Sequence, residues 1–127
     1  MNALAVAPGA AVQFAQNGPS SLGSIMRLSL SEFGLLAVGT YQVMFQVSVN
    51  EQGQLALSLN GVPLAYTTVG RATGSSQIVG IALVTTTAPI SFLSVINPVG
   101  NRAALTVAPY AGGSQQVSAH LVITRLR

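Results

Sequence analysis

His120 is the only histidine of this 127-residue chain, so any chemistry that needs an imidazole depends on it. The chain contains no aspartate, which excludes a serine–histidine–aspartate triad, and no cysteine, which excludes thiolate nucleophiles, thiolate metal ligands and disulfides. The only carboxylate side chains are those of Glu32 and Glu51, which lie far apart in expected turns or strand edges. We therefore expect no enzyme activity, no metal site and no cofactor.

Charged residues make up only 6% of the chain, against roughly 25% in an ordinary domain. The net charge of +3 comes from five scattered arginines, without the basic stripe and interleaved aromatic residues that nucleic-acid binding requires. The sequence has no run of 18 apolar residues and no basic region before its first apolar run. We therefore expect neither a nucleic-acid partner nor membrane insertion, and the N-terminus does not indicate a signal peptide.

Alternating apolar residues and frequent turn signals predict β-strands throughout, because no stretch keeps a helical apolar period over three turns. The clearest strand is residues 40–50, where Tyr41, Val43 and Phe45 share one face. The pair Asn60 and Gly61 predicts a tight turn, since both residues tolerate positive φ. The expected strands are residues 11–16, 23–30, 40–50, 54–61, 76–87, 90–97, 103–109 and 116–127. This pattern favours an all-β sandwich or barrel, with a jelly roll as the best match.

Several of these strands are apolar on both faces, which a small sandwich with one interior does not need. In "QIVGIALV", for example, Val79 and Ile81 oppose Ile78 and Ala82. Each buried Val or Leu contributes roughly 1.5–3 kcal/mol, and few charges hold copies of the chain apart. Closed homo-oligomerisation is therefore favoured, and a monomer with fully wrapped central strands is the alternative.

The segments "VGTYQVMFQVSV", "LALSLNGVPLAYTTVG", "SQIVGIALVTTT" and "SAHLVITRL" resemble the C-terminal globular domain of the BclA-type collagen-like glycoproteins of bacterial spores. The likeness runs from about Pro8 to the C-terminus. "LNGVP" and the Gly-x-Tyr at Gly39 also resemble the globular heads of complement-type proteins, which share the tumour necrosis factor jelly roll. The chain departs from the family pattern at Val43, where the pattern has Phe, and it carries no Gly-x-y repeat.

The resemblance implies a TNF-like jelly roll of about eight to ten antiparallel strands, over residues 11–127, that forms a homotrimer. Residues 1–10 would be a linker from a collagen-like stalk upstream of Met1. In this fold the first, third, sixth and last strands face the threefold axis; we assign them to Val12–Gln16, Thr40–Asn50, Ile90–Asn97 and Val117–Leu126. The alternation of side chains then predicts a trimer interface of Met44, Gln46, Leu93, Val95, His120 and Val122.

The function that the resemblance implies is a structural trimerisation head, which nucleates and caps a collagen-like filament in the exosporium at the spore surface. The alternative is a trimeric binding module that recognises a host protein or a surface glycan through its apical loops. Tyr110 is either a sugar-stacking residue for such a module or an ordinary loop tyrosine. His120 is either a group whose protonation weakens the trimer at pH 5–6 or an ordinary strand histidine.

Overall fold

The computed structural model describes residues 5–20, 23–72, 77–108, 114 and 119–127. Its described part is all-β, and these residues include no helix. The strands are β1 (Ala5–Val6), β2 (Ile25–Arg27), β3 (Phe33–Leu35), β4 (Thr40–Ser48), β5 (Gly53–Leu59), β6 (Val62–Arg71), β7 (Gln77–Thr85), β8 (Ser91–Ile96), β9 (Leu105–Thr106) and β10 (Ala119–Arg125).

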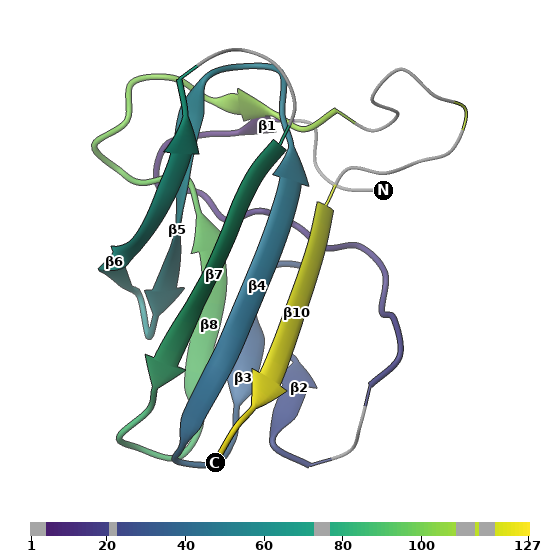
Figure 1. Cartoon of the computed structure of the whole chain (residues 1–127), viewed down its shortest axis with the longest axis vertical. Coiled ribbons are helices and arrows are strands. Elements are labelled where there is room, and N and C mark those ends of the chain that lie inside the picture. Colours follow the sequence, from purple (N-terminus) through teal and green to yellow (C-terminus); the bar gives the residue numbers. More distant parts are fainter. Residues whose placement is uncertain (1–4, 21–22, 73–76, 109–113, 115–118) are drawn as a thin grey trace.

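The strands form two main antiparallel sheets that face each other (Figure 1). One sheet has three strands in the order β10-β4-β7, and the other has five in the order β2-β3-β8-β5-β6. Strands β1 and β9 form a small additional sheet at one end. We call this end, where the β4–β5 turn and residues 97–104 also lie, the loop end (Figure 1, top).

The core lies between the two main sheets and is filled by the inward residues of the predicted alternation. Tyr41, Val43 and Phe45 of β4 are fully or almost fully buried, as are Leu55 and Leu57 of β5. This confirms the inward face predicted for residues 40–50.

Phe45 needs an unusual partner on the neighbouring strand. It lies opposite Gly80 of β7, where an added Cβ would come within 2.5 Å of the Phe45 ring. Glycine is therefore required at this position to make room for the aromatic side chain.

The predicted turn at Asn60 and Gly61 joins β5 to β6. Both residues have positive φ, 53° and 80°, as a two-residue hairpin turn that matches the strand twist requires. The Asn60 side-chain oxygen also accepts a hydrogen bond from the Phe92 backbone N–H (2.8 Å), which fixes the hairpin to β8.

Strand β6 was not among the expected strands. Pro63 has no backbone N–H to donate, which is consistent with a chain that leaves a sheet edge. The structure instead places Val62–Arg71 at the edge of the five-stranded sheet, with Pro63 opposite Ser58. An edge strand tolerates proline because one of its sides needs no backbone donor. Tyr66 of β6 donates a hydrogen bond to the Leu83 carbonyl oxygen of β7 (2.7 Å), which connects the two sheets.

The structure also differs from the expected linker for residues 5–10. Strand β1 pairs with β9, the Val6 side chain is buried in the core, and Gly9 donates a backbone hydrogen bond to Asn97 (2.6 Å). These residues are therefore part of the folded unit.

Candidate functional site

The exposed side of the three-stranded sheet carries five large, exposed apolar side chains. Strand pairing sets its side chains in three rows, because Gln46, Met44 and Gln42 of β4 each lie opposite one residue of β10 and one of β7. We call these nine residues the outer face: Gln42, Met44, Gln46, Val79, Ile81, Leu83, His120, Val122 and Thr124.

The outer face is apolar in its middle and along β7. Val79, Ile81 and Leu83 are 53%, 60% and 53% exposed, and Met44 and Val122 are 42% and 49% exposed. None of the nine residues is an aspartate, glutamate, lysine or arginine, and their side chains make no hydrogen bond to other described residues. A contiguous apolar patch of this kind is typical of a surface that another molecule covers.

Four of the six predicted interface residues lie on the outer face. Met44 is directly opposite Val122, and Gln46 is directly opposite His120, so the four form two neighbouring cross-strand pairs. Their side chains point away from the core, as the alternation along β4 and β10 predicted.

Leu93 and Val95 do not lie on this face, so the prediction that their side chains point outward beside Met44 and Val122 was wrong. Both side chains are fully buried in the subunit core, and their strand β8 belongs to the five-stranded sheet. Residues 11–16 also approach that sheet, because the Val12 N–H bonds to the Val95 carbonyl oxygen (2.8 Å).

The physical reason for the error is the strand count. Because β6 was left out, Ile90–Asn97 was counted as the sixth strand and placed at the interface, whereas Gln77–Thr85, which pairs with β4 in the three-stranded sheet, was not. The residues missed in this way are Val79, Ile81 and Leu83. Their signal was present in the sequence, since "QIVGIALV" is apolar on both faces.

A second polar feature lies at the loop end, where Glu51 holds β9. Its two carboxylate oxygens accept hydrogen bonds from the backbone N–H (2.7 Å) and the hydroxyl (2.6 Å) of Thr106. Partial burial opposes the ionised form of Glu51. The two Thr106 bonds, with a smaller contribution from the Arg71 charge, outweigh that effect and lower the Glu51 pKa below 4.5.

Arg71, at the end of β6, fixes the turn that carries Glu51. Its guanidinium donates to the Glu51 carbonyl oxygen from Nε (3.1 Å) and Nη2 (2.6 Å), and also to the Val49 carbonyl oxygen. The remaining nitrogen, Nη1, is buried and has no hydrogen-bond partner among the described residues. This guanidinium therefore acts on the backbone of its own domain.

Asn97 is a fully buried polar residue that connects three segments at the same end. Its amide nitrogen donates to the carbonyl oxygens of Val6 (2.9 Å) and Ala103 (3.1 Å), and its oxygen accepts from the Asn101 amide (2.9 Å). The side chain thus joins β1, the end of β8 and the segment that leads to β9.

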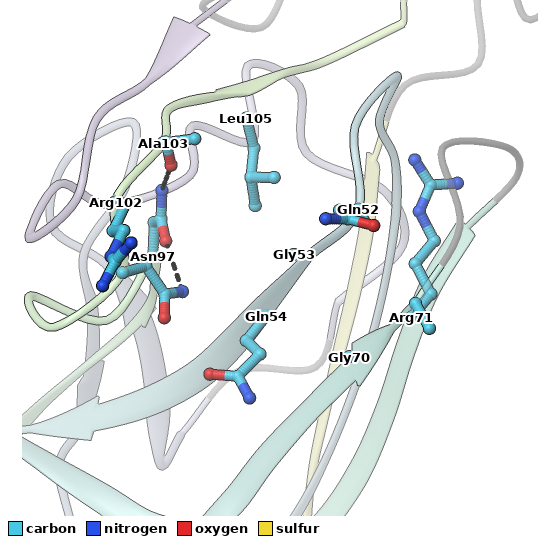
Figure 2. Close-up of a pocket in the computed structure, with 11 residues that line it drawn as sticks. Gln52, Gly53, Gln54, Gly70, Arg71, Asn97, Arg102, Ala103 and Leu105 are labelled. Carbon is cyan, nitrogen blue, oxygen red and sulfur yellow. Dashed lines mark hydrogen bonds between the residues drawn. The ribbon is translucent and has the colours of Figure 1, made fainter.

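Beside this network lies an open groove of about 750 Å³ (Figure 2). Its lining residues come from the start of β5, the end of β6 and the segment before β9: Gln52, Gly53, Gln54, Gly70, Arg71, Ala72, Asn97, Asn101, Arg102, Ala103 and Leu105. Figure 2 shows Arg102 and Asn97 on one side of the groove and Gln52 and Arg71 on the other. No carboxylate is among these residues.

The residues considered for catalysis are not brought together. His120 lies on the outer face, Glu32 in the turn between β2 and β3, and Glu51 at the loop end. Within the described ranges, no group of three or more histidine, cysteine, aspartate or glutamate residues could hold a metal ion. Tyr110 lies outside the described residues.

No helix in the described ranges is long and apolar enough to cross a membrane.

No protein-family model matches the chain, and no curated protein matches it in sequence. Among solved structures, the chain is similar to the crystal structure of the protein YxiM from Bacillus subtilis. The sequence identity is 19% and the TM-score is 0.39, with 97% of this chain and 29% of that chain covered. The chain therefore spans less than a third of the length of that protein.

Proposed function

We propose that this domain is a homotrimerisation head that uses the outer face of the three-stranded sheet as its contact surface. The observation that carries the proposal is the uncharged apolar centre of that face, with five large side chains between 42% and 60% exposed. Covering such side chains is favourable at roughly 25 cal/mol per Å² of apolar area, and no charge on the face opposes it.

The strand order supports a TNF-like jelly roll as the architecture of this head. Strands β4 and β10 fall within Thr40–Asn50 and Val117–Leu126, two of the four segments that the resemblance turns toward the threefold axis, and β7 lies beside β4 in the same sheet. After β4 the chain passes to the five-stranded sheet for β5 and β6, returns to the three-stranded sheet for β7, crosses again for β8, and comes back with β10.

The size of the outer face favours a ring over a face-to-face pair. Three strands about 4.8 Å apart and five residues of about 3.4 Å each give a patch of only about 14 by 17 Å. A stable interface covers roughly 800 Å² on each partner, so the surface beside the face must contribute. Tyr66, which is 68% exposed and bonded to β7, extends the apolar surface in that direction. A heterologous contact that closes as a ring uses both regions on every copy.

A matched pair of substitutions tests this proposal. Val79→Asp places a carboxylate on the outer face, whereas Val62→Asp places one at a similarly exposed position on β6. We expect Val79→Asp to yield monomers at concentrations where the wild type and Val62→Asp are trimers, as measured by sedimentation equilibrium. Circular dichroism checks that both variants keep the β-sheet spectrum. Trimers of Val79→Asp would contradict the proposed interface.

The sequence resemblance extends the proposal to a biological role. A trimeric head raises the effective concentration of three linked chains, so that a collagen-like triple helix nucleates in register. On this proposal the domain nucleates and caps a collagen-like filament of the exosporium at the spore surface. Deletion of the head from the full-length protein should slow or abolish triple-helix refolding in circular dichroism. Unchanged refolding kinetics would contradict this role.

A second candidate function is recognition of a host protein or a surface glycan through the loops of the head. The observation that favours it is the groove at the loop end, which contains polar side chains not used by the fold. A glycan screen with the isolated domain separates the two functions, because the trimerisation role needs no glycan ligand.

A further inference from the structure

The groove at the loop end contains side-chain amides and one guanidinium that have hydrogen-bonding groups available to a ligand. Gln52, Gln54 and Arg102 line it, and none of these side chains bonds to another described residue. The Asn101 amide nitrogen is used by Asn97, but its oxygen has no hydrogen-bond donor among the described residues. A side-chain amide both donates and accepts, as does a sugar hydroxyl.

The electrostatics of the groove favour an anion. Arg71 and Arg102 are the charged residues among the described residues that line it. The Arg71 guanidinium is bound to the carbonyl oxygens of its own turn, so Arg102 is the charge available to a ligand. A guanidinium pairs with a carboxylate through two parallel hydrogen bonds, a geometry that a lysine cannot provide.

The shape of the groove leaves room for a ring. Gly53, Gly70, Ala72 and Ala103 have small or no side chains, so they leave space between the polar groups of the groove. Such a lining presents carbon atoms to the non-polar face of a sugar. The groove is open to solvent and has a volume of about 750 Å³.

We propose that this groove binds a saccharide that carries a carboxylate, with Arg102 on the carboxylate and the amides of Gln52, Gln54 and Asn101 on the hydroxyl groups. The inference rests on the second candidate function and names its ligand class. It does not depend on trimerisation, because the groove belongs to the β5–β6 side of the molecule and shares no residue with the outer face.

The test is a titration of the ¹⁵N-labelled domain with trigalacturonate, with uncharged galactotriose as the matched neutral ligand. We expect saturable shifts of the Gln52 and Gln54 side-chain amides with trigalacturonate only. Arg102→Gln should weaken binding by about tenfold or more. Arg127→Gln removes the same charge at the C-terminus, where no described residue bonds to that side chain, and should leave the affinity unchanged. Gln54→Ala should weaken binding several-fold.

Three results would overturn the proposal: no saturable binding, equal affinity for the two trisaccharides, or an Arg102→Gln variant that binds as well as the wild type. A sulfated trisaccharide serves as a third ligand. If it alone binds, the carboxylate class is wrong while recognition through the loops stands. If no ligand of a wider glycan screen binds either, the second candidate function fails as well.

Discussion

The outer face of the three-stranded sheet and the loop end of the sandwich use polar groups in opposite ways. At the loop end, Glu51, Arg71 and Asn97 each make at least two side-chain hydrogen bonds to other segments of the domain. On the outer face, five large apolar side chains are exposed and no charged residue accompanies them. At the loop end, the charged side chains of Glu51 and Arg71 therefore stabilise the loops of the domain itself.

Arg27 and Arg125 agree with this division. Arg27 donates to Asn17 (2.5 Å) and to backbone carbonyl oxygens, and its guanidinium lies 4.8 Å from the centre of the Phe33 ring. Arg125 donates to Ser24 (3.3 Å) and to the Val38 carbonyl oxygen (3.1 Å). These hydrogen bonds maintain the fold, whereas the apolar side chains of the outer face are exposed and could contact another molecule.

The largest effect on stability is expected at Asn97. Asn97→Ala removes three hydrogen bonds and leaves buried carbonyl groups without donors, so we expect the free energy of unfolding to fall by roughly 2–4 kcal/mol. Urea unfolding measures the change. Asn101→Ala, which removes only one of these bonds, is the matched control and should cost about 1 kcal/mol. Equal effects of both substitutions would contradict the central role of Asn97.

Arg71→Met should have the next largest effect, because it removes the donors to the Val49 and Glu51 carbonyl oxygens while keeping the aliphatic stem. We expect a loss of roughly 1–3 kcal/mol in urea unfolding. The mass of the assembly, measured by sedimentation equilibrium at a fixed concentration, should stay unchanged, since Arg71 is not on the outer face. A variant that folds normally but no longer associates would contradict the view that Arg71 stabilises the fold and takes no part in association.

Glu51→Gln tests the contribution of the carboxylate charge. The folded-state pKa of Glu51 is lowered, so its stabilising effect is present above about pH 4.5 and is lost as the pH falls through the folded-state value. We expect the wild type to exceed Glu51→Gln by roughly 1 kcal/mol at pH 7, with the difference shrinking toward pH 3. Urea unfolding at several pH values measures it, and a difference independent of pH would contradict the assignment.

The smallest effect is expected at His120, which lies opposite Gln46 toward one end of the outer face. His120→Gln keeps an uncharged polar side chain there and leaves the five exposed apolar side chains in place, so the association constant from sedimentation equilibrium should stay within about threefold of the wild type. A loss of association as large as that of Val79→Asp would contradict the apolar centre of the face as its main contact.

Local sequence patterns predicted the parts of the fold that depend on neighbouring residues. The alternation along residues 40–50 and the turn at Asn60 and Gly61 are both present, because side-chain direction and positive φ are local properties. Strand β6 was missed because the effect of Pro63 depends on whether the strand lies at an edge, which only the sheet order reveals.

The outer face was predictable in part for the same reason. Met44 and Val122 follow from alternation within their own strands, whereas the place of Leu93 required knowing which sheet β8 joins. The Asn97 network could not be predicted, because its partners at Val6 and Ala103 are brought together only by the tertiary fold. Nothing in the local sequence distinguishes this asparagine from one in an ordinary loop.

We propose that other copies of the same chain cover the outer face of this domain. Sedimentation equilibrium of the wild-type domain at micromolar concentration measures this association. We expect a mass three times the 12.9 kDa of one chain. A mass of one chain, unchanged as the concentration rises to about a hundred micromolar, would contradict it.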